Sequence, residues 1–528
     1  MPDPLAAPGH SAASPFLPRE KGLKAGALGL LSTVVIGVSS TAPAYGIAAT
    51  VGLIAAAVGL QSPAIMLVAF VPMLCIAVAY RALNAAEPDC GTTFTWAARA
   101  FGSRTGWMGG WGIIAADVIV MANLAQIAGQ YSFLLVGADG LAANAGWTTL
   151  AGLVWIAALT WVSYRGIELS ARLQFLLLAL EITVLLVFAV VALVKVYTGH
   201  AAAGAVHPQL SWLNPFAISS GSALSAGVLL AVFIYWGWDA ALAVNEETRD
   251  AARTPGRAGV ISTLILVVLF VLLTVACVSY GGVSLLTNPA NQGDVLAVLA
   301  NQVFGSTWGK LLILATLSSA AASTQTTIMP TARTTLSMAA YRAIPAVFAR
   351  IHPRYLTPSI ATIVMGTVSA VFFAGVALLN HGRALGDVVG AVGLLIAFYY
   401  AMTGYACVWY FRRELRHDLR AAITKGLLPL IGTATLTWAF VTTAKDSFAS
   451  SYGITSLGGV GGVFIIGIGS LVVGALLMLA WAWHATDYFH GDTLDAPLID
   501  PNLGLPAHEP QQAARRQVSA ATLDGEQP

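Results

Sequence analysis

Charged residues are scarce in this 528-residue chain, at 9% of the sequence against 57% hydrophobic residues. Soluble domains carry roughly 25% charged residues, so water cannot be the main solvent of this protein. No hydrophilic stretch is long enough to form a separate catalytic domain, and the net charge of +2 is too small to indicate a nucleic-acid partner. The composition therefore predicts an all-α protein that spans a lipid bilayer many times.

Cysteine is also rare, and the histidines are scattered. The four cysteines lie far apart, without CxxC spacing, at Cys75, Cys90, Cys277 and Cys407. This spacing indicates no disulfide framework, and no histidine cluster completes a zinc site. His207, His352 and His417 lie in separate loops, with no partner spacing for a catalytic triad. A membrane-bound transferase would need a polar catalytic cluster, so we expect no enzymatic activity, no metal and no cofactor.

Long apolar runs dominate what remains. A spanning helix needs roughly 20 consecutive apolar residues, and about twelve such runs can be found. We expect the spans at residues 27–55, 63–84, 106–136, 147–164, 173–198, 217–244, 259–283, 309–338, 358–380, 385–411, 425–444 and 459–485. Residues 1–26 lack the apolar core and cleavage site of a signal peptide and predict a short tail. Residues 486–528, rich in proline and scattered charges, predict a disordered tail.

The positions of the basic residues predict the orientation. With a cytoplasmic N-terminus and twelve alternating spans, only four of the 26 lysines and arginines fall on the outer side, namely Lys195, Lys310, Arg383 and Lys445. The opposite orientation would reverse this distribution and violate the positive-inside rule. We therefore expect a multi-pass protein of the inner (plasma) membrane with both termini in the cytoplasm.

Two of the predicted spans contain residues that interrupt a helix. In the first span, Pro43 removes a backbone donor, and the preceding hydroxyl side chains can satisfy the freed carbonyl groups or a ligand. In the sixth, Gly237 lies among large aromatic side chains and is followed by Asp239. The alternatives are a simple proline kink in the first span and a packing glycine in the sixth. Inside a bilayer, however, a real break survives only where it lines a cavity or a binding site.

The two predicted breaks lie at corresponding positions of two five-helix halves, which is typical of transporters built from inverted repeats. At such a break, the N-terminal end of a half-helix can bind a carboxylate, and carbonyl groups at the opposite ends can bind an ammonium group. This arrangement would suit the zwitterion of an amino acid. The predicted substrate-binding residues are Ser39, Ser40, Thr41, Ala42, Phe233, Tyr235, Trp236 and Gly237.

Three acidic residues of the predicted spans are candidates for proton coupling: Asp117, Glu181 and Asp239. An ionisable group in the bilayer costs at least about 2.5 to 3.5 kcal/mol near a helix centre, so each should face a cavity or a partner. Burial favours the neutral form of a carboxyl group, which lets such a group exchange a proton during transport. The alternative for Asp117 and Glu181 is a protonated side chain hydrogen-bonded between helices.

Three segments resemble motifs of the amino acid/polyamine/organocation permeases. Glu87–Trp96 (EPDCGTTFTW) looks like that family's Pro-x-x-Gly-Gly/Thr-x-Tyr loop. The run from Trp236 to Asp239, followed by Asn245–Thr248 and Pro255, is similar to the family's Phe-x-Gly-x-Glu and Glu-x-x-x-Pro pattern. Arg333 and Met338–Pro345 (MAAYRAIP) look like its Ser-Arg and Met-Ala-Arg-Asp-Gly-x-x-Pro signature. The usual Gly-Ser-Gly of the first break is missing, which predicts a stiffer loop there.

The resemblance implies the leucine-transporter fold and roles for individual residues. Its implied divisions are a tail (1–26), a first repeat (27–198), an outer loop (199–216), a second repeat (217–411), a loop with two further helices (412–485) and a second tail (486–528). Phe233 matches the aromatic lid over the substrate, and Asp239 matches the family's acidic position. Glu181 aligns where some proton-coupled members carry a lysine in place of a sodium ion. It could take up a proton itself, or bind a cation together with Ser318, Ser319, Ser323 and Thr324.

The resulting hypothesis is a secondary active transporter for amino acids or related amines, and the alignment of Glu181 favours coupling to protons. A sodium-coupled symporter and a polyamine or amino acid exchanger remain as alternatives on the same fold. A membrane nutrient sensor that does not transport is a further alternative. Trp236 and Trp238 near the predicted site favour small or medium substrates.

Overall fold

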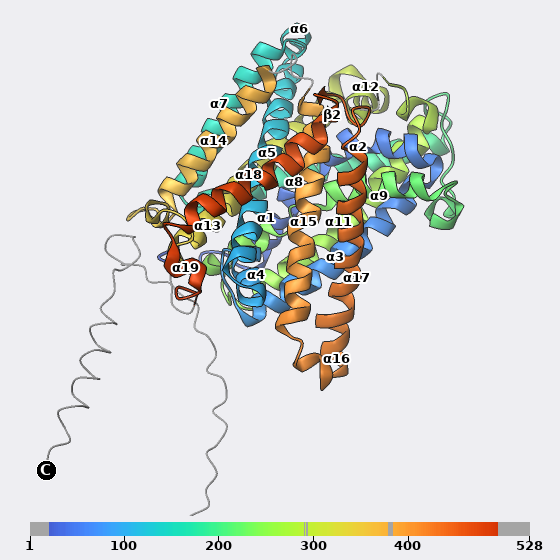
Figure 1. The fold of residues 1–528 in the computed structure, drawn as a ribbon. Coiled ribbons are helices and arrows are strands. Elements are labelled where there is room, and N and C mark those ends of the chain that lie inside the picture. The colour runs from blue at the N-terminus through green and yellow to red at the C-terminus, as the bar shows by residue number, and fades with distance from the viewer. Residues whose placement is uncertain (1–20, 290, 292–293, 379–383, 495–528) are drawn as a thin grey trace, which may run out of the picture.

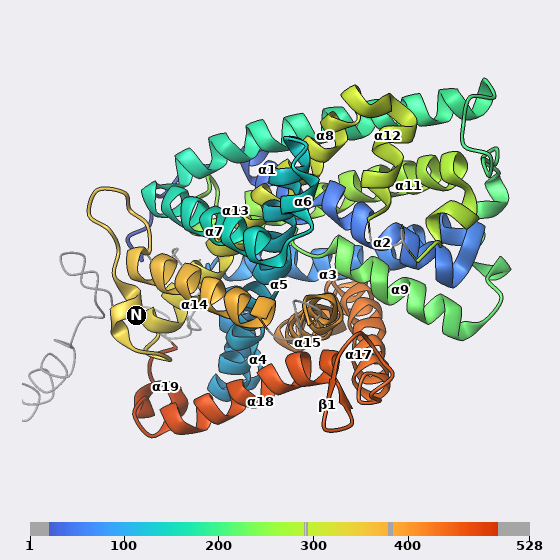
Figure 2. The same ribbon diagram turned by 90° about the horizontal axis from the view of Figure 1, so that it is seen from above.

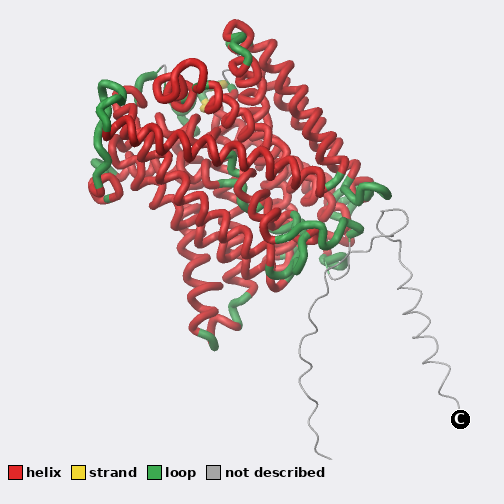
Figure 3. The backbone as a smooth tube through the Cα atoms, turned by 180° about the vertical axis from the view of Figure 1, so that it is seen from behind, coloured by secondary structure: helices red, strands yellow, loops and turns green. Residues whose placement is uncertain are grey.

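The computed structural model describes residues 21–289, 291, 294–378 and 384–494, and helices make up most of this part of the chain (Figure 3). Within these residues, eleven helical stretches are long and apolar enough to cross a membrane. The first stretch, Leu30–Ala86, holds three helices, α1 (Leu30–Ser40), α2 (Pro43–Val58) and α3 (Ser62–Ala86). The protein is therefore an all-α multi-pass membrane protein, as predicted, while twelve spans in two inverted repeats stay a prediction.

The remaining long helices follow in chain order. They are α5 (Ser103–Leu135), α7 (Ala145–Arg165), α8 (Ile167–Tyr197), α9 (Gly221–Tyr235), α11 (Thr254–Leu286), α13 (Lys310–Ala340), α14 (Ser359–Leu378), α15 (Leu385–Tyr410), α17 (Leu428–Asp446) and α18 (Gly462–Ala482). Shorter elements connect them, including α4 (Thr93–Phe101), α6 (Asp139–Ala142), α10 (Ala240–Ala243), α12 (Val295–Trp308), α16 (Leu419–Ala421) and α19 (Thr486–His490). A two-stranded hairpin, β1 (Ser456–Leu457) and β2 (Val460–Gly461), precedes α18.

Helix α13 lies at the centre of the bundle, where it packs against α5 and α8. In its spanning window 83% of residues are buried, against 17% for α18. The sequence explains the difference, because α13 carries many hydroxyl side chains, whose polar groups are costly to expose to lipid. Helices α7 and α14 lie side by side along one edge, and α18 crosses in front of α15 (Figures 1 and 2).

The described parts of both predicted tails differ from the expectation. Lys21 is only 2% exposed, and Leu28 pairs with the chain after α10 through its backbone, since its amide donates to the Glu247 carbonyl at 3.0 Å. Residues 486–490 form α19, which docks because the Tyr488 hydroxyl donates to the Ser103 carbonyl at 2.8 Å. The prediction of disorder was therefore wrong for residues 486–494. Residues 1–20 and 495–528 lie outside the described part.

Candidate functional site

The first spanning helix is interrupted between α1 and α2. Helix α1 ends at Ser40, and Ala42 adopts a left-handed backbone conformation with φ of 47°. Pro43 then opens α2, where its missing amide hydrogen costs nothing. We call Thr41 and Ala42 the first break. The prediction of an interrupted first span is confirmed.

The sixth spanning helix is interrupted between α9 and α10. Helix α9 ends at Tyr235, Trp236 is extended, and Gly237 has a φ of 114°. Residues 236–239, which we call the second break, form turns before α10 begins. A Cβ atom added to Gly237 would lie 2.6 Å from the carbonyl oxygen of Ser40. The second break therefore lies directly against the backbone at the end of α1, next to the first break, in the interior of the bundle.

Replacing Gly237 with alanine should remove most folded, active protein. The φ of 114° strains any residue with a Cβ atom, at a cost of about 1–3 kcal/mol, and the overlap with Ser40 adds to it. Gly393→Ala is the matched control, because nothing lies within 4 Å of a Cβ at that helical position. Fluorescence-detected size-exclusion chromatography should show a loss of monodisperse protein for Gly237→Ala and no loss for Gly393→Ala. Equal monodisperse yields of the two variants would refute the close contact.

Glu181 of α8 binds the start of α2. Its Oε1 atom accepts a hydrogen bond from the Ala44 amide at 2.8 Å. The Tyr45 amide donates to Ser319 Oγ at 3.3 Å. Glu181 is fully buried, and its Oε2 atom has no hydrogen-bond partner among the described residues. An ionisable side chain therefore binds the backbone amide just after the first break, so this amide is not free.

This contact corrects one sequence-based expectation. The amides at the start of α2 were expected to be open to a substrate carboxylate. Ala44 and Tyr45 already donate to Glu181 and Ser319, and the Ala42 amide donates to the Ser39 carbonyl at 3.2 Å. The expectation failed because composition locates a break but cannot reveal which side chain of another helix reaches it.

The predicted cation-site residues on α13 separate into two groups. Ser319 reaches the first break as described, and Ser323 Oγ donates to the Ser40 carbonyl at 2.9 Å. Ser318 bonds instead to the Leu177 carbonyl of α8 at 2.9 Å, and Thr324 bonds within its own helix to Ala320. The structure thus brings Ser319 and Ser323, but not the Thr324 hydroxyl, to the neighbourhood of Glu181 and the break.

Asp239 lies at the second break and is held by two tyrosines of α15. Its Oδ2 accepts from the Tyr399 hydroxyl at 3.1 Å, and its Oδ1 accepts from the Tyr400 hydroxyl at 2.9 Å. The indole of Trp236 donates to the same Tyr399 hydroxyl. Asp239 is only partly buried, although its neighbours Trp238 and Ala240 are buried. Two tyrosine hydroxyl groups therefore position this carboxyl group, and Trp236 in turn holds one of them.

Asp117 of α5 lies near this group. Its Oδ2 accepts from the Thr331 hydroxyl of α13 at 2.8 Å, and it interacts electrostatically with Asp239. On the first-break side, the Tyr45 hydroxyl donates to Asn123 of α5. The structure thus brings Asp117 and Asp239 near each other at the second break. The third predicted acidic residue, Glu181 of α8, lies instead at the first break.

The aromatic residues of α9 face different ways. Phe233 packs edge-on against Tyr45, with ring centroids 6.5 Å apart, and lines a cavity of about 210 Å³ between α9, α15 and α17. Tyr235 is fully buried, and its hydroxyl donates to the Met66 carbonyl of α3 at 3.0 Å. The ring of Tyr235 packs against Phe270 of α11. The side chain of Tyr235 therefore points away from the breaks, and its role in substrate binding stays a prediction.

Comparison with known proteins agrees with this architecture. The family model described as amino acid permease matches residues 28–451. The chain belongs to the amino acid permease family. It is thus a membrane transporter and not an enzyme, and the resemblance inferred from the three motifs is confirmed.

Three relatives illustrate the range of this family. An uncharacterized transporter of Mycobacterium tuberculosis is 29% identical over 416 residues, which is 77% of this permease and 83% of the relative. A branched-chain amino acid permease of Bacillus subtilis is 26% identical over 325 residues, 57% of this chain and 65% of the relative. A low-affinity putrescine importer of Escherichia coli is 22% identical over 395 residues, which is 73% of this chain and 82% of the relative.

The permease also contains a buried charge cluster at the end of the bundle where α1 begins. Lys21 Nζ lies 2.9 Å from Asp89 Oδ2 and also pairs with Glu246. Asp89 further accepts from Ser337 at 2.7 Å and from the Tyr341 hydroxyl at 2.8 Å. We call these five residues the Lys21 cluster. It ties the segment before α1 to the α3–α4 loop, to the chain after α10 and to the end of α13.

Charge balance within the Lys21 cluster fixes its protonation. Burial disfavours the Lys21 ammonium, but the nearby carboxylates outweigh burial and hold the pKa of Lys21 well above its usual range. Burial likewise opposes ionisation of Asp89, but Lys21 and the hydrogen bonds hold the pKa of Asp89 well below its usual range. Cys90 lies close enough to Asp89 and Glu246 to suggest a metal site, but the Lys21 ammonium lies among the three.

A second buried ion pair joins the same region. Arg333 of α13 binds Glu247 with two hydrogen bonds, of 2.5 Å and 2.9 Å. Asn245 donates to Asn84 at 2.8 Å and to the Asp89 carbonyl at 3.0 Å. Motif residues of the permease thus hold this end together. The sequence interpretation recognised the motifs but missed Lys21, although the basic residues just before the first span could have been matched to the acidic motif residues.

Proposed function

We propose that this permease is a secondary active transporter that carries amino acids or related amines by alternating access, driven by protons. Both termini would lie in the cytoplasm and the spans in the inner membrane, as the basic residues indicate. One observation supports the mechanism above all others. A buried carboxyl group, Glu181, binds the Ala44 amide at the first break, so its protonation state and the structure of the break are linked.

Protonation of Glu181 would change what the break can bind. Ionised, Glu181 accepts the Ala44 amide strongly, since charge-assisted hydrogen bonds are roughly twice as strong as neutral ones. Its second oxygen has no partner among the described residues, a costly arrangement for a buried anion. A proton on that oxygen would remove the charge and weaken the hold on Ala44. The amide would then be available to a substrate carboxylate, which couples proton uptake to substrate binding.

Asp239 would bind the ammonium group shared by amino acids and amines. It is only partly buried, and Asp117 adds negative potential nearby. Trp236 at the second break would limit substrate size, whereas Trp238 is fully buried and packs against Tyr80 and Tyr400. The named substrates of the relatives, branched-chain amino acids and putrescine, share this ammonium group.

Sodium coupling is the second candidate. The oxygen atoms of Ser319 and Ser323 lie at the first break, where they could join Glu181 around a cation. Hard cations prefer oxygen ligands of this kind. In this case Glu181 would remain ionised and contribute charge to the site rather than carry a proton.

The proposed function can be tested with purified protein. A thermal-shift screen against amino acids and amines would first identify a ligand. Uptake of that ligand into proteoliposomes should then follow an imposed pH gradient and disappear with a protonophore. Uptake that follows a sodium gradient and ignores the protonophore would favour the second candidate. Binding without any counterflow would instead indicate a sensor.

A further inference from the structure

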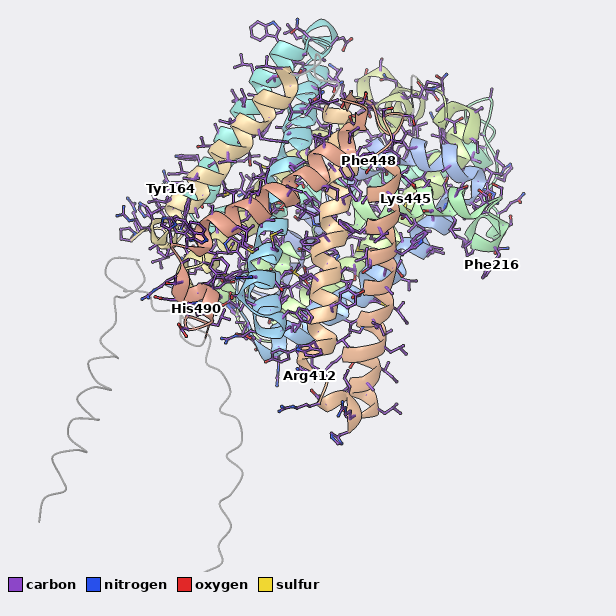
Figure 4. The ribbon with its side chains drawn as sticks, in the orientation of Figure 1. Tyr164, Phe216, Arg412, Lys445, Phe448 and His490 are labelled. Carbon is purple, nitrogen blue, oxygen red and sulfur yellow. The ribbon has the colours of Figure 1, made fainter. Side chains whose placement is uncertain are left out.

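A basic cavity lies on the rim of the bundle, outside the substrate site. It has a volume of about 400 Å³ and lies where α7 ends and α8 begins, opposite the loop before α14. Tyr164, at the end of α7, marks this edge of the bundle (Figure 4). The charged side chains that line it are Lys24, Arg165, Glu168, Arg172 and Arg354.

The cavity carries an excess of positive charge. Lys24 pairs with Glu168, with Nζ and Oε1 2.8 Å apart. Within the described residues, Arg165, Arg172 and Arg354 form no ion pair. Three guanidinium groups from three separate segments therefore converge without a bound carboxylate of their own. A guanidinium group offers paired N–H donors that match a phosphate group.

Aromatic side chains hold two of these arginines in place. The Arg165 guanidinium lies 4.9 Å from the ring centroid of Trp161 and 5.2 Å from that of Tyr355. Arg354 lies 5.7 Å from the Tyr355 centroid. The loop is fixed to α7, since the Thr357 hydroxyl donates to the Tyr164 carbonyl at 2.9 Å. The cavity is thus formed before any ligand arrives.

An exposed apolar surface continues from the cavity along the helices. Leu169 lines the cavity and is 43% exposed, and Leu176 is 67% exposed. Together with Arg172 they lie at positions i, i+3 and i+7, on one face of α8. Trp161 on α7 is 55% exposed. A ligand that fits both surfaces has an anionic head and an apolar tail.

We propose that this cavity binds the phosphate group of an anionic phospholipid in the leaflet at this end of the bundle. The three arginines bind the headgroup, and the acyl chains lie along Leu169 and Leu176. Each lysine or arginine near an anionic leaflet contributes about 1 kcal/mol of attraction to the membrane surface. Because three arginines line one cavity, they can bind the headgroup of a single lipid molecule. The proposal depends only on membrane insertion, and not on substrate or coupling.

Native mass spectrometry of the full-length protein can test this site. The protein would be released from mixed dioleoylphosphatidylglycerol and dioleoylphosphatidylcholine nanodiscs, and the retained lipids counted. The test variant replaces Arg165, Arg172 and Arg354 with glutamine. The matched control replaces Arg413, Arg416 and Arg420, which are equally exposed but line a different loop. Both variants lose the same charge, so a general effect of net charge would alter both equally.

Wild type and control should retain phosphatidylglycerol in preference to phosphatidylcholine, and the test variant should lose that preference about tenfold or more. A variant with lysines at the three positions should retain part of it, and Arg172→Gln alone should weaken it if the triple variant does not fold. Equal preference in the test and control variants would overturn the proposal. Protection from thermal unfolding by inorganic phosphate equal to that by phosphatidylglycerol would also overturn it, in favour of an aqueous anion.

Discussion

Replacing Glu181 with glutamine is expected to reduce uptake driven by a pH gradient to background while leaving substrate counterflow measurable. Glutamine resembles the protonated carboxyl group in shape and can still accept from the Ala44 amide, but it cannot release or take up a proton. Counterflow exchanges substrate without net proton movement, so a carrier fixed in the neutral state can still perform it. The measurement is initial uptake into proteoliposomes, with and without the gradient, beside a counterflow assay.

The controls distinguish coupling from damage to the fold. Asp139→Asn changes an exposed carboxylate on α6 and should behave as wild type. Glu181→Asp keeps a titratable group and should restore part of the gradient-driven uptake. If Glu181→Gln still accumulates substrate in response to the pH gradient, then Glu181 is not the coupling group and the proton mechanism fails.

Lys21→Met is expected to cause the largest loss of stability. Removing one partner of a buried ion pair typically costs about 3–5 kcal/mol, because the other charge stays buried without compensation. Lys21 is 2% exposed, and Asp89 is 3% exposed. Lys445→Met, at an exposed lysine on α17 shown in Figure 4, is the matched control. Thermal unfolding of the purified proteins should show the loss in the first variant only.

The same variant should acquire a new pH dependence. In the wild type the pKa of Asp89 is lowered, so its contribution to stability is present above about pH 4 and is lost only in stronger acid. The pKa of Lys21 is raised, so its contribution is present below about pH 10. Both contributions therefore stay constant between about pH 5 and pH 9.

Without Lys21, Asp89 and Glu246 are two buried carboxyl groups with no cation beside them. Burial already raises the pKa of Glu246 in the wild type. Without Lys21, burial and mutual repulsion raise the folded-state pKa of Asp89 and raise that of Glu246 further, so folding favours the protonated forms. Their stabilising contribution is present at low pH and lost as the pH rises, so the deficit of Lys21→Met should grow from about pH 5 to about pH 8. A deficit that does not change over this range would show that the Lys21 cluster is not electrostatically coupled.

The sequence alone was sufficient to predict an all-α multi-pass membrane protein and both breaks, because these features are local. A run of about twenty apolar residues predicts a membrane span in most contexts. A proline beside hydroxyl residues, as at Pro43, likewise predicts a helix break. Boundaries were less certain where charges enter a helix. Helix α8 begins at Ile167 rather than at 173, since Glu168 and Arg172 lie in its first turns and face the basic cavity instead of lipid.

Contacts between distant segments could not be predicted in the same way. Lys21 looked like a tail residue because its partners lie 68 and 225 positions away, and only the packed bundle brings them together. The orientation of Tyr235 was predictable in principle. Residues two apart on a helix project about 200° apart, so Phe233 and Tyr235 could not both face the breaks.

Substrate protection of a cysteine at the breaks tests the central claim most directly. The four native cysteines and Ser40 are all buried. In a background whose native cysteines are replaced by serine, Ser40→Cys should therefore react with a membrane-impermeant methanethiosulfonate cation in proteoliposomes only when alternating access opens the breaks. The best ligand from the thermal-shift screen should slow this labelling strongly, yet leave labelling of Asp139→Cys on exposed α6 unchanged. Labelling of Ser40→Cys that proceeds equally fast with and without saturating ligand would contradict a substrate site between the two broken helices.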